Sequence, residues 1–199
     1  MEAQGATRAR VIVGAVRQGS KQEPNPVDRR ILRGERRHRQ LLEATLVVIE
    51  RDSVAAVSHR TVAREAGVSP SAVAYHFESI DELLSKALTM VTEDFAAEIA
   101  SAADISALVA AVHQFLTSKS RRMVAVYELY LLAARRPALL PAAQQWIDSV
   151  ESVARRMGQS RSAARGTSAL IDGLGLQAVL TGRPPSSREI AALLRRVGE

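Results

Sequence analysis

Apolar residues recur at helical spacing through most of the chain. A clear example follows Ser79, where five apolar residues form one stripe: Leu84, Leu88, Val91, Phe95 and Ile99. Their spacing of three or four residues puts them on one face of a helix. Similar patterns fill eight other segments, and Pro137, Gly158 and the run 182–185 separate the later ones. The pattern predicts an all-α fold of nine helices without strands, beginning near Gly34.

The composition is typical of a globular helical chain and excludes several kinds of functional site. Of the 199 residues, 47% are hydrophobic and only 4% are aromatic. The absence of cysteine excludes a disulfide framework, a thiolate metal site and a cysteine nucleophile, and we expect no metal or cofactor. The apolar run 11–16 is too short for a signal peptide, and no apolar run is long enough to span a membrane. A cytoplasmic location is therefore expected.

The positive charge of the chain is concentrated at its start. Residues 1–40 contain ten Lys or Arg and four Asp or Glu, so the whole net charge of +6 lies there. Residues 1–33 also contain scattered Gly and Pro without a sustained period, which predicts a flexible basic leader. The leader is either a solvated tail or an electrostatic arm for nucleic acid.

A helix-turn-helix pattern lies between residues 58 and 77. Ser58 is a suitable N-cap for a short helix, and Gly67 can close that helix in the left-handed conformation. Ser69 then caps the next helix, with Pro70 at its first position, where a missing amide hydrogen does no harm. Two short helices joined by a glycine-led turn are typical of a DNA-binding helix-turn-helix.

The second helix of this pair sorts its side chains onto two faces. Val73 and Phe77 are four residues apart and are expected to face inward. The opposite face holds four short or amphipathic side chains: Ser71, Ala72, Tyr75 and His76. Such side chains suit the major groove of DNA. Alternatively, Tyr75 and His76 pack on the first helix as a capping pair.

Positive charge crowds the start of the first helix, at Arg36, Arg37, His38 and Arg39. These charges oppose the helix dipole, and a phosphate contact would explain them. Ser79 and Glu82 form a capping box for the fourth helix, whose first amides can also receive a phosphate. These features predict that this part of the chain binds double-stranded DNA.

Four segments resemble the DNA-binding domain of the TetR family of repressors: EA at 43–44, TVAREAGVSPS at 61–71, YHFES at 75–79 and DELL at 81–84. The resemblance covers roughly residues 36–90. It implies a nine-helix fold whose third helix reads the major groove. It also implies that the fourth helix couples the DNA-binding and ligand domains, and that the last two helices pair with their symmetry mates in a four-helix bundle.

By position, the resemblance implies DNA contacts from Ser58 and Arg60 on the second helix. It implies that five residues belong to the reading face: Ser69, Ser71, Ala72, Tyr75 and His76. The chain departs from the family at two positions, since Ala74 stands where an aromatic residue is usual and Ile80 where Lys is usual. The segment 128–137 and Trp146 resemble one regulatory-domain subtype, which does not fix an effector.

The C-terminal part offers candidates for a ligand pocket. Five large residues are candidate lining: Phe115, Met123, Tyr127, Tyr130 and Trp146. Four polar residues are candidate pocket groups, solvent-facing groups or interface groups: His113, Gln114, Glu128 and Asp172. The alternative for each large residue is an ordinary place in the hydrophobic core. The pattern therefore favours an unidentified small-molecule effector without assigning its chemistry.

The last two helices are expected to form a homodimer. The eighth, over 162–180, has too much apolar surface for one buried stripe, and the ninth, over 187–197, is short and amphipathic. The predicted interface residues are Leu170, Leu174, Leu176, Ile190 and Leu194. The alternative is that both helices only cover the core of their own subunit.

Together these features predict three segments: a leader at 1–33, a helix-turn-helix domain at 34–80, and a ligand-sensing and dimerisation domain at 81–199. The predicted function is repression, with release from a palindromic operator when an effector binds. A second interpretation is a constitutive architectural DNA-binding protein. An enzyme is disfavoured, because the chain has four histidines and lacks HExxH, GxSxG and a glycine-rich phosphate loop.

Overall fold

The computed structural model describes residues 26–118 and 120–198 of the chain. This part forms nine α-helices and no strand, which confirms the predicted fold class. The α-helices are α1 (Pro26–Asp52), α2 (His59–Ala66), α3 (Pro70–His76), α4 (Ile80–Ala100), α5 (Ile105–Ser118), α6 (Ser120–Ala133), α7 (Leu140–Arg156), α8 (Arg161–Thr181) and α9 (Ser187–Gly198). Two short 3₁₀ helices, η1 (Val54–Ala56) and η2 (Pro137–Leu139), follow α1 and α6. None of the described helices has the length and apolar character needed to cross a bilayer.

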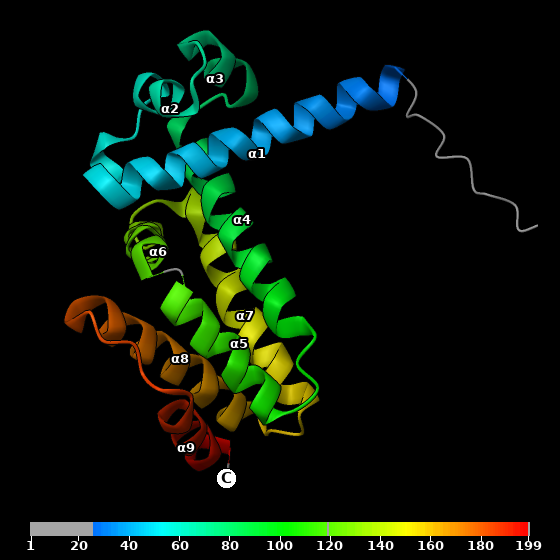
Figure 1. The fold of residues 1–199 in the computed structure, drawn as a ribbon, viewed down its shortest axis with the longest axis vertical. Helices are drawn as coiled ribbons and strands as arrows, with labels where there is room; N and C mark the ends of the chain where they lie inside the picture. The colour runs from blue at the N-terminus through cyan, green and yellow to red at the C-terminus, as the bar shows by residue number, and fades with distance from the viewer. Residues whose placement is uncertain (1–25, 119, 199) are drawn as a thin grey trace, which may run out of the picture.

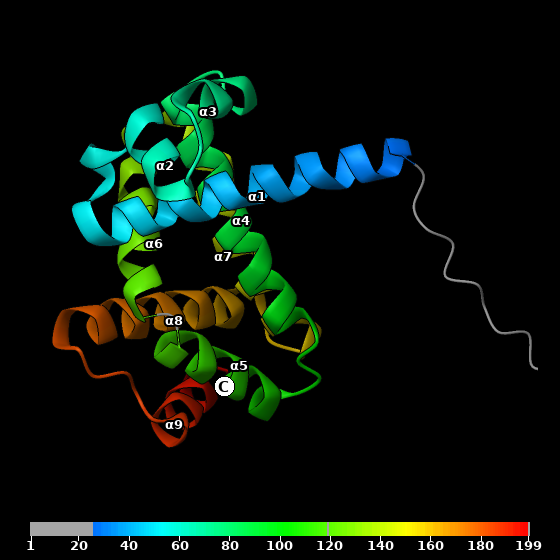
Figure 2. The same ribbon diagram turned by 45° about the horizontal axis from the view of Figure 1, so that its top comes forward.

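The helices are arranged in two parts on either side of α1. In Figure 1, α2 and α3 lie on one side of α1, and the remaining helices extend from the other side. Figure 2 shows α6 running between α1 and α8, while α4 descends on the opposite flank beside α7. α4 and α6 are therefore the two helices that connect the small N-terminal part with α5, α8 and α9.

A single hydrophobic core runs through both parts. α4 makes this possible because it packs against α1 and against α7. Leu84 near its start and Phe95 near its end each expose 1% or less of their surface. Full burial of one such side chain contributes about 1.5–3 kcal/mol, so the apolar stripe read from the sequence is the main stabilising feature of α4.

The first helix begins earlier than the sequence pattern predicted. α1 starts at Pro26, so residues 26–33 are helical and the predicted flexible leader is wrong for this stretch. Proline at the first position of a helix is favourable, and Gly34 is tolerated inside the helix. Figures 1 and 2 both show the N-terminal half of α1 projecting from the rest of the molecule. Residues 1–25, the remainder of the predicted leader, lie outside the described residues.

The close approach of α6 and α8 depends on Gly175. This residue has no side chain, and a Cβ atom there would overlap the hydroxyl oxygen of Tyr127 on α6. The same Cβ would lie 3.2 Å from the Met123 terminal methyl and 3.3 Å from a Leu116 methyl. The Tyr127 hydroxyl is also fixed, since it donates a hydrogen bond of 2.8 Å to the Asp172 backbone oxygen.

We expect Gly175→Ala to lower the free energy of unfolding by about 1–2 kcal/mol. The added methyl group must displace Tyr127, and the resulting strain outweighs the better helix propensity of alanine. Thermal and urea unfolding would measure the change. Gly34→Ala is the matched control, because a Cβ atom at that helical glycine meets nothing within 4 Å and should not lower stability. Equal stabilisation by both substitutions would contradict the close approach.

Candidate nucleic-acid interface and effector domain

Local capping interactions build the helix-turn-helix. The Ser58 hydroxyl accepts from the Thr61 amide at 3.1 Å, and the Thr61 hydroxyl accepts from the Ser58 amide at 2.9 Å. Gly67 ends α2 in the left-handed conformation with φ 66° and ψ 36°, which glycine adopts without strain. The Ser69 hydroxyl then accepts from the Ala72 amide at 3.3 Å, and Pro70 opens α3. These contacts fix the turn between the two helices.

The inner face of α3 is as the sequence predicted. Val73 and Phe77 expose 0% and 1% of their surface and belong to the core. Tyr75 projects into solvent with 86% of its surface exposed, and Ser71 is also exposed. Ala72 is half-buried. α3 therefore offers an outer face of short side chains with one long aromatic group.

Tyr75 and His76 have different surroundings in the structure. His76 is half-buried and its ring lies 6.1 Å from that of His38 on α1, in an edge-on arrangement. His38 in turn packs at 4.7 Å on Phe77. Burial lowers the pKa of His38, and the positive charges of His76 and Lys86 lower it further. His76 therefore packs on α1, as the second interpretation of this pair predicted, whereas Tyr75 makes no such contact with α1.

The other predicted DNA-contact serines act in helix caps. Ser58 is half-buried and caps α2, whereas Arg60, two residues later, is exposed. The Ser79 hydroxyl accepts from the Glu82 amide at 3.1 Å. The Glu82 carboxylate closes the turn by accepting from the Glu78 amide at 2.8 Å, one residue before the cap. Both serines therefore keep the starts of their helices in place.

The projecting half of α1 carries an arginine stripe. Its members are exposed and recur at i, i+4, i+7 and i+8: Arg29, Arg33, Arg36 and Arg37. None of these four forms an ion pair with a described residue. Arg39 differs, since it is paired with Asp94 of α4 at 2.6 Å. Arg29 and Arg33 were missed from the sequence because residues up to 33 were assigned to the leader.

Three of the five predicted pocket residues are buried in the hydrophobic core, and two of them, Trp146 and Phe115, take part in an aromatic stack. The rings of Trp146 and Phe95 stack at 4.5 Å, and Phe115 lies 4.5 Å from Phe95. Trp146 and Phe115 expose only 3% and 2% of their surface. For these two residues the core interpretation holds, although the indole edge of Trp146 has a polar partner.

A carboxylate links the remaining aromatic candidates. The Trp146 indole nitrogen donates to an Asp172 carboxylate oxygen at 2.8 Å. Burial raises the pKa of Asp172. Burial also raises the pKa of Tyr127, and raises that of Tyr130 to about 12, with the charge of Asp172 as the second cause in both. We call these four residues the Asp172 cluster: Asp172, Trp146, Tyr127 and Tyr130.

An apolar cavity lies beside the contact between α6 and α8. It has a volume of about 330 Å³, and its lining includes Leu116, Met123, Val124, Gly175 and Ala178. Arg121 also lines it. Of the five predicted pocket residues, Met123 is the one that lines this cavity.

The predicted dimer residues divide into two groups. Leu174, Ile190 and Leu194 expose 6%, 0% and 0% of their surface, so these three predictions are wrong for a surface between subunits. Their side chains are used in the core of their own chain, and Leu170 is half-buried against the same core. Leu176 is 43% exposed as predicted, and Leu180, which sequence reasoning missed, is 76% exposed.

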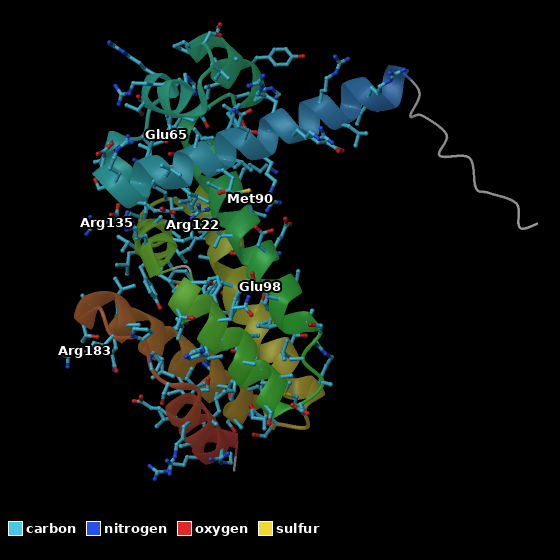
Figure 3. The ribbon with its side chains drawn as sticks, in the orientation of Figure 1. Glu65, Met90, Glu98, Arg122, Arg135 and Arg183 are labelled. Carbon is cyan, nitrogen blue, oxygen red and sulfur yellow. The ribbon has the colours of Figure 1, made fainter. Side chains whose placement is uncertain are left out.

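Polar contacts tie α6 to the N-terminal part. Arg122, labelled in Figure 3, reaches from α6 to α1, where it pairs with Glu43 at 2.8 Å and with Glu50. Glu128 accepts from the Val54 amide of η1 at 2.6 Å, so it is not a pocket group. Sequence reasoning missed the role of Arg122 because its partners precede it by more than seventy residues.

Comparison with known proteins covers both parts of the chain. The family model described as "Bacterial regulatory proteins, tetR family" matches residues 41–87, and that of the "Tetracyclin repressor-like, C-terminal domain" matches residues 100–199. The HTH-type nicotine-responsive transcriptional repressor HdnoR of Paenarthrobacter nicotinovorans is 28% identical over 186 residues, which are 81% of this chain and 96% of HdnoR.

Solved structures agree with this assignment. The multidrug binding protein EbrR in complex with ethidium has a TM-score of 0.70 and 33% identity, over 82% of this chain and 99% of EbrR. The TetR-family member SCO1917 of Streptomyces coelicolor A3 has a TM-score of 0.74 and 32% identity, over 82% of this chain and 98% of SCO1917. The chain belongs to the TetR family of transcriptional regulators.

Proposed function

We propose that the protein is a cytoplasmic repressor that binds a palindromic operator as a homodimer and leaves it when a small molecule binds. The observation that carries the proposal is the outer face of α3. Tyr75 is 86% exposed on a seven-residue helix whose Val73 is completely buried. A helix anchored by its inner face can enter the major groove with its outer face against the bases.

The arginine stripe of α1 supports a second set of contacts with DNA. Four exposed guanidinium groups that form no ion pair with a described residue lie on one helix face. They suit a row of phosphates, which carry no sequence information but contribute affinity. Tyr75 and Ser71 would read bases, and Arg36 and Arg37 would hold the backbone. Arg60 would add a contact from α2.

An exposed stripe on α8 supports the homodimer. It consists of the half-buried Gly173 and the exposed Ala169, Leu176 and Leu180, at spacings of four, three and four residues. Such spacing is typical of helices that pack in a bundle, and a Cβ atom at Gly173 would meet nothing within 4 Å. A twofold pairing of this stripe would bury the exposed leucines and match a palindromic site.

Cavities in the C-terminal domain support ligand sensing over a purely architectural role. Architectural DNA binding needs no hollow such as the 330 Å³ cavity beside Met123 and Gly175. The names of the relatives also support an effector, since EbrR is described with ethidium, proflavin and malachite green, and HdnoR as nicotine-responsive. We propose that an effector binds in this domain and acts on α1 through α6.

Two substitutions would distinguish base contacts from phosphate contacts. We expect Tyr75→Ala to lower affinity for the selected operator by about 1–3 kcal/mol with little effect on random DNA, because it removes a base-reading group. Arg36→Ala should weaken binding to all sequences and reduce the salt slope by about one, because it removes a phosphate contact. Binding would be measured by fluorescence anisotropy over a salt series.

Arg196→Ala is the control, because this arginine is exposed on α9, at the far end of the molecule from α3. It should change neither affinity nor slope. If Tyr75→Ala binds the operator as tightly as the wild type, α3 is not the reading helix.

The dimer can be tested on exposed leucines alone. We expect Leu180→Arg to give a folded monomer that no longer binds the operator, because the charge would be buried in the seam between subunits. Sedimentation equilibrium at micromolar concentration would give the mass, and circular dichroism the helix content. Leu131→Arg on α6 is the matched control, since Leu131 is 71% exposed and lies off the stripe. A dimeric Leu180→Arg would refute this interface.

A further inference from the structure

The cavity lined by α5, α6 and α8 has walls that offer few polar groups. Leu116, Met123 and Ala178 contribute buried apolar side chains from the three helices. Thr117 also lines the cavity, but its hydroxyl already donates to two backbone oxygens of its own helix, at 2.8 and 3.2 Å. The walls therefore suit the apolar part of a ligand.

The size of this cavity limits what it can hold. Its volume is about 330 Å³, which is at the lower end of the range for small-molecule sites. With about 30 Å³ for each small group, as for a molecule in liquid water, it has room for about ten non-hydrogen atoms. A short hydrocarbon chain with one polar end fits both this volume and the apolar walls.

The cavity has a positive charge at its exposed edge. Among the described residues that line it, Arg121 is the only charged one. Arg121 is exposed and forms no ion pair with a described residue. A guanidinium group presents its N–H donors in a planar fork that matches a carboxylate. The apolar walls together with this cation therefore favour a ligand that has one anionic end.

Acidic side chains on the other side of Arg121 are already paired. Arg121 also lines a second cavity, of about 460 Å³, together with Glu43, Glu50 and Asp94. Glu43 and Glu50 both pair with Arg122, and Asp94 pairs with an arginine of α1. None of these three carboxylates forms an ion pair with Arg121, so its guanidinium group is available to a ligand.

We propose that this cavity binds an amphipathic organic acid, a carboxylate on an apolar chain of about eight carbons, with Arg121 holding the carboxylate. This inference rests on the proposed function, in which an effector binds the C-terminal domain, and it adds the chemical class of that effector. Arg121 directly precedes Arg122, which joins α6 to α1. The ligand acid would therefore bind next to the connection through which the effector is proposed to act.

The test compares two probes that share one apolar chain. Octanoate carries a negative charge near pH 7, and octanamide has an uncharged head group of nearly the same shape. Binding of each probe to the full chain is measured by isothermal titration calorimetry without DNA. For the wild type we expect octanoate to bind about fivefold more tightly than octanamide or better, because the contact with Arg121 is charge-assisted but partly screened by water.

Arg121→Gln should weaken octanoate binding by about fivefold or more and leave octanamide binding within about twofold, because it removes the charge and leaves the apolar walls unchanged. Arg121 is exposed, so the fold should be retained, and circular dichroism would verify it.

Arg183→Gln is the matched control. Arg183 is exposed and lies between Gly182 and Pro184, which both line the cavity, but it is not itself part of the lining. Figure 3 labels it at the edge of the molecule, beside the end of α8. The substitution removes the same charge from the same neighbourhood, and it should change octanoate affinity by less than about twofold.

Three results would overturn the proposal. They are a wild type that binds octanoate no more tightly than octanamide, an Arg121→Gln variant with unchanged octanoate affinity, and an Arg183→Gln variant that loses as much affinity as Arg121→Gln. Operator binding is measured separately on the ligand-free protein. Its failure would refute the proposed function while leaving the probe result standing, and a normal operator affinity with failed probe binding would refute only the present inference.

Discussion

The continuous buried face of α4 is the constraint on which the two parts of the molecule depend. Leu84 and Leu88 are buried toward its start and Phe95 and Ile99 toward its end, so one helix contributes to the core beneath α3 and to the core of the effector domain. Packing at interior density does not deform gradually. A shift of α4 relative to α7 would therefore move the N-terminal helices as a unit, which is how a distant site can act on α3.

α6 adds a second connection of a different physical kind. Its contact with α1 is polar, through Arg122 and the two glutamates of α1, whereas its contact with α8 is a close steric fit at Gly175. The ion pairs are directional and partly exposed, with 22% of the Arg122 side chain accessible. Such pairs contribute little stability but fix geometry. α6 thus joins a cavity-lining face to the helix that supports the DNA-binding part.

Charge is used differently at the two ends of the molecule. The arginine stripe of α1 is exposed and forms no ion pair with a described residue, which costs little because water solvates each guanidinium group. Asp172 is half-buried, and its carboxylate accepts a hydrogen bond from the neutral indole of Trp146. An excess of exposed positive charge favours a large polyanion.

Local signals account for most of what the sequence determined. The caps at Ser58, Ser69 and Ser79, the left-handed Gly67 and the proline at position 70 act within a few residues, so the helix-turn-helix and the buried face of α3 could be predicted without tertiary information. Helical periodicity likewise gave the number of α-helices within the described residues. The start of α1 was missed although its signal, Pro26, is local, because no apolar stripe accompanies it.

Only the tertiary structure decided which apolar and polar groups meet. The apolar residues of α8 surround the helix, so periodicity does not tell whether Leu174 or Leu176 faces the core. Packing within the chain's own core buries the first and leaves the second exposed. In the same way, Arg122 and its glutamates, or Asp172 and Trp146, are separated in sequence by 26 residues or more. Such contacts depend on how whole helices pack, and no local pattern in the chain records them.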